Sequence, residues 1–248
     1  METPSPDLTA PPALAEDLFG EHLGGALGYA RLLATTGVDH GLIGPREVPR
    51  LWERHILNCA VLARLLDPGI SVGDIGSGAG LPGLAVAIAR PDLRMHLIEP
   101  LARRTVWLEA AVDELGLENV TVHRGRADSL AGVERFDVVT ARAVARLDKL
   151  AAWSAPILRA GGELIALKGS SAEQEIAEDF DTIRRAGGVD PSVEILGDGE
   201  LEVPTTVVRI AFPVERVVGG AAAASRRSTK RQGGRASRPQ RGGPKRRS

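Results

Sequence analysis

Residues 72–84 read VGDIGSGAGLPGL and place four glycines within eight positions, directly after an apolar run and an aspartate. Glycine adopts positive φ freely and lets another group approach the main chain closely. A proline such as Pro82 is tolerated in the first turn of a helix, where its missing N–H would have no partner. The stretch therefore predicts a strand that ends near Asp74, a ligand-binding turn and a helix.

Outside this loop the apolar segments alternate in type. Short apolar runs and helical patterns follow one another along residues 70–169, which predicts buried parallel strands with helices on both faces of a sheet. The last two runs, PSVEILG (191–197) and TTVVRIAFP (205–213), have no helix between them. They predict an antiparallel pair that closes the sheet.

Composition and periodicity divide the chain into four expected parts. Helical patterns over residues 14–34 and 46–66, with a loop over 35–46 between them, predict a small helical cap before the sheet. The expected parts are a disordered N-terminus (1–13), the N-terminal helical cap (14–68), the α/β domain (69–215) and a disordered basic tail (216–248).

Charge is distributed unevenly along the chain. Residues 225–248 hold ten Lys or Arg and no acid, which leaves 21 basic against 32 acidic residues in 1–224, a net charge of −11. This segment is rich in Gly, Ser, Pro and Arg and has no hydrophobic period, so we expect it to be disordered and to contact nucleic-acid phosphates. A solubilising extension is the alternative.

Composition also excludes other classes of protein. The single Cys59 excludes a disulfide framework and a cysteine-based zinc site, and the histidines lack ligand spacing with acids, so no metal is expected. The sequence has no apolar run of about 18 residues and no signal peptide. A cytoplasmic monomer without a membrane span is expected.

Acidic residues at the strand ends predict what the glycine loop holds. Asp74 would repel a pyrophosphate, which argues against a dinucleotide, but it can bind a ligand ammonium directly or through water. Glu99 ends the second strand, where an acid receives ribose hydroxyls. Asp128 follows the third strand and can accept from an adenine amine. An amino-acid ammonium, a ribose and an adenine together describe S-adenosylmethionine.

Four motifs resemble those of one family. DIGSGAGLPGLAVAI (74–88), RHILN (54–58), FDVVTARAVARL (136–147) and LIALKG (164–169) look like the bacterial small-subunit ribosomal RNA guanine-N7 methyltransferases, also called the glucose-inhibited division protein B family. The resemblance covers about residues 45–215. It implies a class I S-adenosylmethionine-dependent methyltransferase, Rossmann-like, with a mostly parallel sheet and an antiparallel final strand. It also implies methylation of guanine N7 in the 530 loop of 16S ribosomal RNA, in the 30S subunit or an assembly intermediate.

The strand ends and the resemblance together give the expected site. Residues expected to bind the donor are Asp74, Gly76, Gly78, Gly80, Leu81, Glu99, Ala127, Asp128 and Arg142. Residues expected to meet RNA are Arg54, His55, Arg103, Arg104 and Lys168. For His55 a place in the core is equally open, and Lys168 can instead solvate its strand end.

No catalytic side chain is identified, and the chemistry explains why none is needed. Guanine N7 carries no proton, so catalysis can rest on positioning the acceptor in line with the methyl group. The segment TARAVARL (140–147) has neither the Asn/Asp-Pro-Pro-aromatic motif of amine methylation nor a nucleophilic cysteine. Two alternatives remain: a small-molecule methyltransferase, which the acidic body favours, and a non-enzymatic RNA-binding module with a vestigial pocket.

Overall fold

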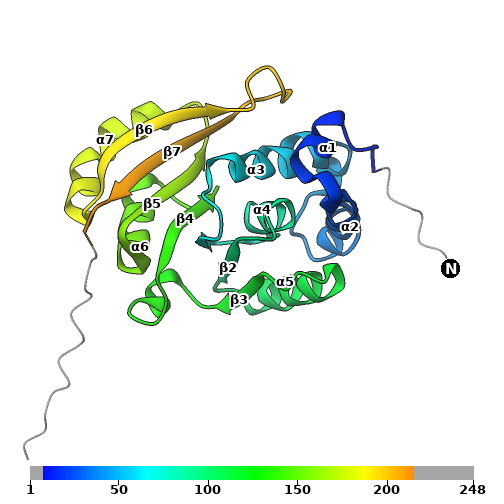
Figure 1. Ribbon diagram of the computed structural model, residues 1–248, viewed down its shortest axis with the longest axis horizontal. Coiled ribbons are helices and arrows are strands. Elements are labelled where there is room, and N and C mark those ends of the chain that lie inside the picture. The colour runs from blue at the N-terminus through cyan, green and yellow to red at the C-terminus, as the bar shows by residue number, and fades with distance from the viewer. Residues whose placement is uncertain (1–7, 215–248) are drawn as a thin grey trace, which may run out of the picture. The chain divides into compact units, whose positions relative to one another are not determined.

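A seven-stranded sheet forms the centre of the structure, a computed structural model that describes residues 8–214 (Figure 1). The expected basic tail lies outside the described residues. The strands are β1 (Ser71–Ile75), β2 (Arg94–Glu99), β3 (Val120–Arg124), β4 (Phe136–Arg142), β5 (Leu158–Lys168), β6 (Val189–Leu196) and β7 (Thr205–Phe212). The α-helices are α1 (Ala13–Phe19), α2 (Leu23–Leu32), α3 (Asn58–Ala60), α4 (Gly83–Ala89), α5 (Ala102–Leu115), α6 (Leu147–Ser154) and α7 (Ala172–Ala186).

The strand order is β3-β2-β1-β4-β5-β7-β6. The pairs β1–β2, β1–β4, β2–β3 and β4–β5 are parallel, whereas β7 runs antiparallel to both β5 and β6. This confirms the predicted class I methyltransferase sheet, mostly parallel with an antiparallel final strand. The chain moves outward from β1 to β3 and then returns to place β4 on the other side of β1. Ligands of open α/β sheets bind at such a reversal, beyond the carboxyl ends of the strands.

Each face of the sheet has its own hydrophobic core. Side chains such as Val72 and Leu97 join the core with α4, α5 and the N-terminal helices, while Val139 and Leu164 join the core with α6 and α7. The two sets of helices lie on opposite sides of the sheet in Figure 1. Because successive residues of a strand point to opposite faces, both cores come from alternate positions of the same strands.

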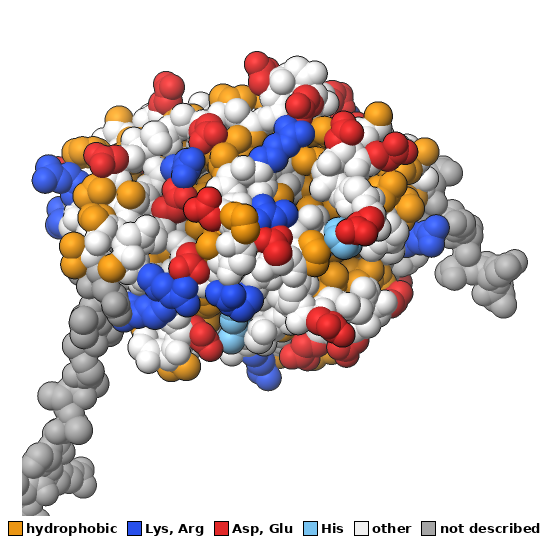
Figure 2. Space-filling model, viewed as in Figure 1, with side chains coloured by type: hydrophobic (Ala, Val, Ile, Leu, Met, Phe, Trp, Pro, Cys, Tyr) orange, Lys and Arg blue, Asp and Glu red, His pale blue; other side chains and the backbone are white. Residues whose placement is uncertain are grey.

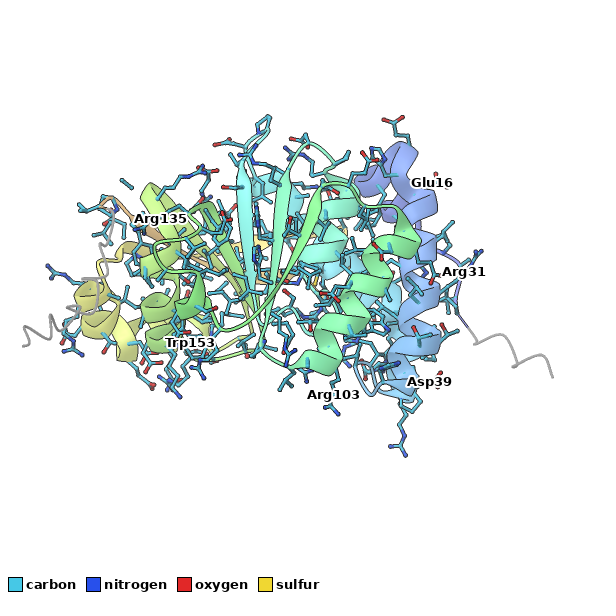
Figure 3. All side chains as sticks on the ribbon, turned by 90° about the horizontal axis from the view of Figure 1, so that it is seen from below. Glu16, Arg31, Asp39, Arg103, Arg135 and Trp153 are labelled. Carbon is cyan, nitrogen blue, oxygen red and sulfur yellow. The ribbon has the colours of Figure 1, made fainter. Side chains whose placement is uncertain are left out.

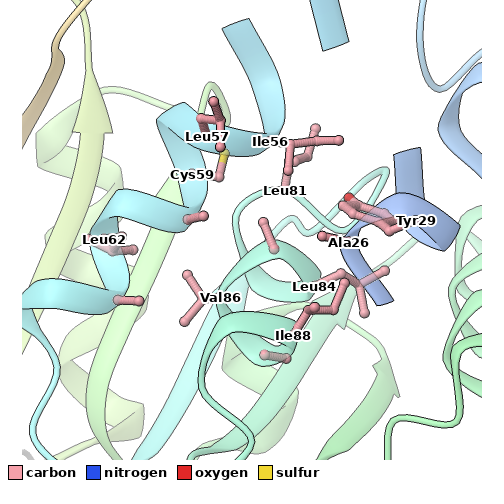
Figure 4. Packing of buried hydrophobic residues seen from close by; sticks show 14 of the residues in the cluster. Ala26, Tyr29, Ile56, Leu57, Cys59, Leu62, Leu81, Leu84, Val86 and Ile88 are labelled. Atoms are coloured by element: carbon pink, nitrogen blue, oxygen red, sulfur yellow. The ribbon is translucent and has the colours of Figure 1, made fainter. Parts of the chain in front are cut away.

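The N-terminal helices pack directly on α4. One core contains Ala26 and Tyr29 of α2, Ile56, Cys59 and Leu62 of the next helical stretch, and Leu84 and Ile88 of α4 (Figure 4). All of these side chains are at most 3% exposed. The expected helical cap and the first face of the sheet therefore share one core. Ahead of α1, the carbonyl of Thr9 accepts a hydrogen bond of 3.1 Å from Trp52 Nε1.

The two long helices expected in the cap are irregular. The first expected helix is interrupted at Gly20, whose φ of 50° is incompatible with an α-helix. After α2 the chain stays helical as a π-helical turn, Leu33–Gly37, so the loop expected from residue 35 starts later than predicted. The second region is helical from Pro45 to Leu65 but changes between 3₁₀, π and α geometry. Pro49 lies inside the first segment, Pro45–Arg50, where its missing N–H removes a hydrogen bond to the preceding turn.

Two further features differ from the sequence expectations. Helix α7 was not predicted, although it is amphipathic and ends at Gly187, which has a φ of 96°. Strand β3 was expected to be buried on both faces but is half-exposed, because it lies at the edge of the sheet. No helix within residues 8–214 is long and apolar enough to cross a membrane.

Candidate functional site

A cavity of about 640 Å³ lies at the point where the strand order reverses. Its walls come from the loops after β1, β2, β3 and β4, with a contribution from the cap. The structure brings together here most of the residues expected to bind a methyl donor: Gly76, Gly78, Leu81, Glu99, Ala127, Asp128 and Arg142. Asp74 and Gly80 are absent from its lining.

The glycine loop needs glycine for two different reasons. A Cβ at Gly76 would lie 2.7 Å from Val144, so this glycine lets the loops after β1 and β4 touch. At Gly78, which has a φ of 57°, a Cβ would meet no atom closer than 3.7 Å and would occupy open space beside the cavity. Gly78 is therefore the position at which a ligand can approach the main chain.

Asp74 is buried beneath the loop rather than exposed to the cavity. Its side chain is 0% exposed, and Oδ2 accepts a hydrogen bond of 3.1 Å from the N–H of Gly83. A Cβ at Gly83 would lie 2.8 Å from that oxygen, which explains the glycine. Burial raises the pKa of Asp74 to about 7. Of the two modes expected for Asp74, direct contact with a ligand and contact through water, this buried position favours the second. Its Oδ1 has no hydrogen-bond partner within residues 8–214.

Glu99 fixes the loop from the neighbouring strand. Its Oε2 accepts from the N–H of Gly78 at 3.1 Å and its Oε1 from the N–H of Leu101 at 2.9 Å. Arg104 approaches Oε2 at 3.6 Å. The carboxylate lines the cavity, and each oxygen retains a further lone pair for a ligand hydroxyl.

The cap also holds the glycine loop, through a contact that the sequence analysis missed. Tyr29 of α2 is fully buried, and its hydroxyl donates to the carbonyl of Ala79 at 2.8 Å. Burial raises its pKa well above the usual value. A buried tyrosine needs a partner for its hydroxyl, and Tyr29 is the only tyrosine of the chain. From the sequence one can expect a hydrogen-bond partner for the Tyr29 hydroxyl, but not that this partner is the carbonyl of Ala79.

The far end of the cavity is bordered by an aromatic ring. Ala127 and Asp128 follow β3, and the half-buried Trp153 of α6 lines the same end. The guanidinium of Arg126 lies over the Trp153 ring at 5.8 Å. Neither Arg126 nor Trp153 was predicted from the sequence to be a site residue.

Arg142 ends β4 and lines two cavities. A second cavity of about 460 Å³ shares Arg142 and Ala143 with the first. It is also lined by Arg54, Asn58, Leu167, Lys168, Gly169, Glu175, Val203, Pro204, Thr205 and Thr206. Asn58 donates to Thr205 Oγ1 at 2.9 Å and to the carbonyl of Val203 at 2.8 Å, which ties the cap to the start of β7.

The residues expected to meet RNA have different surroundings. His55 lines the first cavity, and Arg54 and Lys168 line the second. Lys168 is only 9% exposed, and its Nζ donates to Glu175 at 2.6 Å and to the carbonyl of Ala145 at 2.9 Å. The alternative for Lys168, that it solvates its strand end, is therefore wrong, because α7, which was not predicted, supplies a carboxylate partner.

The two arginines at the start of α5 point in different directions. Arg103 is exposed and projects away from the helix (Figure 3), where a phosphate contact stays a prediction. Arg104 turns into the first cavity beside Glu99, so the structure groups it with the donor residues rather than with the outer surface. Within residues 8–214 there is no group of three His, Cys, Asp or Glu side chains arranged to hold a metal ion.

Comparison with known proteins identifies the relatives of this chain. Residues 24–203 match the family model described as rRNA small subunit methyltransferase G. The ribosomal RNA small subunit methyltransferase G of Pseudarthrobacter chlorophenolicus is 57% identical over 79% of this chain and 91% of its own length. The protein of the same name from Streptomyces avermitilis is 48% identical over 95% of this chain and 99% of its own length.

The fold also matches solved structures. The structure of PigF with SAH aligns with a TM-score of 0.51 over 80% of this chain and 70% of that chain, at 17% sequence identity. At this identity the match supports the methyltransferase fold alone.

Substitution of Gly78 tests whether a ligand approaches the main chain at the first cavity. We expect Gly78→Ala to weaken donor binding at least tenfold, because the added Cβ fills the space beside the cavity. Gly116→Ala is the matched control: its φ of 64° is also positive, and a Cβ there meets nothing within 4 Å. Calorimetry with S-adenosylmethionine measures both. Equal affinities in the two variants would contradict the assignment.

Asp74→Asn separates the loop contact of Asp74 from its charge. The pKa of about 7 lies above the usual aspartate value of 3.8, so the ligand-free fold loses stability as the pH rises between these values and Asp74 ionises. The neutral amide still accepts from Gly83. We expect the melting temperature of the variant, relative to wild type, to rise across this pH range.

The affinity of Asp74→Asn for the methyl donor should fall, whereas its melting temperature relative to wild type should rise. Loss of a charge-assisted contact to the donor ammonium costs about 1.5–3 kcal/mol, or roughly ten- to a hundredfold in affinity. Unchanged affinity would mean that Asp74 serves the loop alone.

Proposed function

The chain belongs to the rRNA small subunit methyltransferase G family, and on that premise we propose that it transfers the methyl group of S-adenosylmethionine to N7 of a guanine in the 530 loop of 16S ribosomal RNA. The observation that carries this proposal is the pair of cavities that meet at Arg142 and Ala143. One cavity suits the donor, and the other lies where an acceptor base would face it.

The residues of the first cavity fit S-adenosylmethionine. Gly78 offers the open main-chain position for the methionine moiety, and the unpartnered Oδ1 of Asp74 can take its ammonium through a water molecule. Glu99 suits the ribose hydroxyls. Ala127, Asp128 and Trp153 border the adenine end. When bound, the donor would supply a methyl group attached to a positively charged sulfur, and this charge makes the methyl carbon an electrophile.

The second cavity suits a purine that has left its base stack. Methyltransferases reach a base within structured nucleic acid by extruding it into a pocket. Asn58, Lys168 and Glu175 give this cavity both hydrogen-bond donors and acceptors. Three of the five N–H groups of Arg142 are used in contacts with the cap, so two remain for an oxygen of the acceptor. Guanine O6, beside N7, is the oxygen that we assign to them.

The side chains at the junction match a reaction without a general base. Arg142 donates hydrogen bonds only, and both ring nitrogens of His55 already have partners. Since guanine N7 attacks with a lone pair and carries no proton, the protein needs to orient it along the axis of the bond between sulfur and methyl. The purine gains a positive charge as the methyl group arrives. The carboxylate of Glu175 in the second cavity favours that charge.

On the face that Figure 2 shows, RNA would meet separate basic side chains rather than one broad basic patch. On the face shown in Figure 2, acidic and basic side chains are interspersed. Arg103 and Arg126 are exposed near the first cavity. The partner that we propose is 16S ribosomal RNA in the 30S subunit or an assembly intermediate, in the cytoplasm. The expected contribution of the basic tail lies outside the described residues.

Methyl transfer to unmodified ribosomes tests the function directly. We expect the purified protein to transfer labelled methyl from S-adenosylmethionine to 16S ribosomal RNA of subunits from a strain that lacks the enzyme. Mass spectrometry should locate one 7-methylguanine in the 530 loop. Labelling of a metabolite extract instead of RNA would support the small-molecule alternative, and absence of donor binding would support the vestigial one.

Filling the second cavity tests its assignment to the acceptor. Gly169 lines it, and a Cβ there meets nothing within 4 Å, so we expect Gly169→Phe to occupy the cavity without disturbing the fold. Methylation should fall at least tenfold while donor affinity stays the same. Gly24→Phe is the matched control, because Gly24 also has open space and lies in α2, outside both cavities. A normal rate in Gly169→Phe would place the acceptor elsewhere.

A further inference from the structure

The cap holds Arg142 at the junction of the two cavities through three hydrogen bonds. Nη1 of Arg142 donates to Cys59 Sγ at 3.0 Å, and Nη2 donates to the carbonyl of Arg54 at 3.1 Å and to His55 Nδ1 at 2.9 Å. None of these acceptors is a carboxylate. Within residues 8–214, Arg142 forms no ion pair. Its position therefore depends on neutral acceptors, of which the His55 ring is the only one that can change its charge near neutral pH.

The guanidinium determines the protonation of His55. An arginine donates hydrogen bonds and never accepts them, so His55 Nδ1 must be without a proton. The ring proton then lies on Nε2, which donates to Glu47 Oε2 at 3.0 Å. The His55 side chain is 16% exposed. Burial and the charge of Arg142 keep the pKa of His55 below its usual value, although Glu47 acts in the opposite direction.

We propose that Glu47 and His55 are positioning residues, which fix the guanidinium of Arg142 between donor and acceptor. Glu47 lines neither cavity, so it acts through the groups that it contacts, which are the His55 ring at 3.0 Å and, at 3.5 Å, Nη1 of Arg54. Both nitrogens of that ring are occupied, which excludes His55 as a proton acceptor in the reaction. The role of Arg142 toward substrate rests on the proposed function, whereas its attachment to Glu47 and His55 does not.

This chain of hydrogen bonds makes the position of Arg142 sensitive to pH. Protonation of His55 places an N–H on Nδ1, opposite an N–H of Arg142, and the contact is lost. The charged groups that face the ring are Glu47, Arg54 and Arg142, and Arg50 lies near Glu47. Because the pKa of His55 is lowered, the hydrogen bond between Arg142 Nη2 and His55 Nδ1 persists at neutral pH. It is lost as the pH falls below the usual pKa of histidine.

Nitrogen NMR of the full chain, without donor or RNA, tests the attachment itself. We expect the His55 signals to report a neutral ring protonated at Nε2. Arg142→Ala should raise the pKa of His55 because it removes a positive neighbour, and Glu47→Gln should lower it because it removes a negative one, each by about one pH unit. Shifts in the same direction, or no shift in either variant, would overturn the proposal. This experiment does not depend on methylation.

Kinetics test the consequence for catalysis. We expect His55→Leu to lower kcat about ten- to a hundredfold, because Arg142 is displaced. His55→Asn keeps a short acceptor that does not titrate, so it should recover part of kcat and lose the decline at acid pH. His40→Leu, at an exposed position in the cap, is the control and should match wild type.

Two results would contradict the positioning role. One is a kcat of His55→Leu equal to that of wild type. The other is a decline of kcat at acid pH in His55→Asn that matches the decline in wild type. If wild type itself fails to methylate ribosomal RNA while the NMR result holds, the proposed function fails and the attachment of Arg142 stands.

Discussion

The main-chain N–H groups of the glycine loop need acceptors, and for two of these groups the acceptors are buried carboxylates on adjacent strands. Asp74 accepts from Gly83 and Glu99 accepts from Gly78, while the Tyr29 hydroxyl donates to Ala79 from above. Unpaired main-chain groups at this depth would each cost free energy comparable to a lost hydrogen bond. These three contacts fix the loop, and the loop in turn forms one wall of the donor cavity and touches the segment after β4.

The place where β1 and β4 lie side by side explains why donor and acceptor meet. The loops after these two strands touch at Gly76 and Val144. The two residues before Val144, Arg142 and Ala143, also line the cavity proposed for the acceptor. Ala143 has a φ of 54°, which is unfavourable for an alanine and turns the chain sharply between the two cavities. The cap then determines where Arg142 lies. An N-terminal helical region without a catalytic group of its own thus contributes to the geometry of the junction.

The sequence was informative where the signal is local. Strand and helix periods and the glycine spacing predicted the sheet, the strand ends predicted Glu99 and Asp128, and the family resemblance added Ala127 and Arg142. All four residues line the cavity. It was uninformative about contacts between distant segments, such as Tyr29 with Ala79 and Arg142 with His55, because periodicity does not determine which side chains meet. For the same reason the sequence left open whether Asp74 contacts a ligand directly or through water. A carboxylate at a strand end can face the ligand or the adjoining loop, and only the packing of α4 decides between them.

A crystal structure with bound S-adenosylhomocysteine tests most directly the claim that the two cavities serve donor and acceptor. We expect the amino-acid end against Gly78, the ribose hydroxyls on Glu99 and the adenine beside Ala127 and Trp153. The sulfur should face the shared wall at Arg142 and Ala143, with the second cavity open before it. A ligand seated in the second cavity, or a sulfur directed away from Arg142, would contradict the claim.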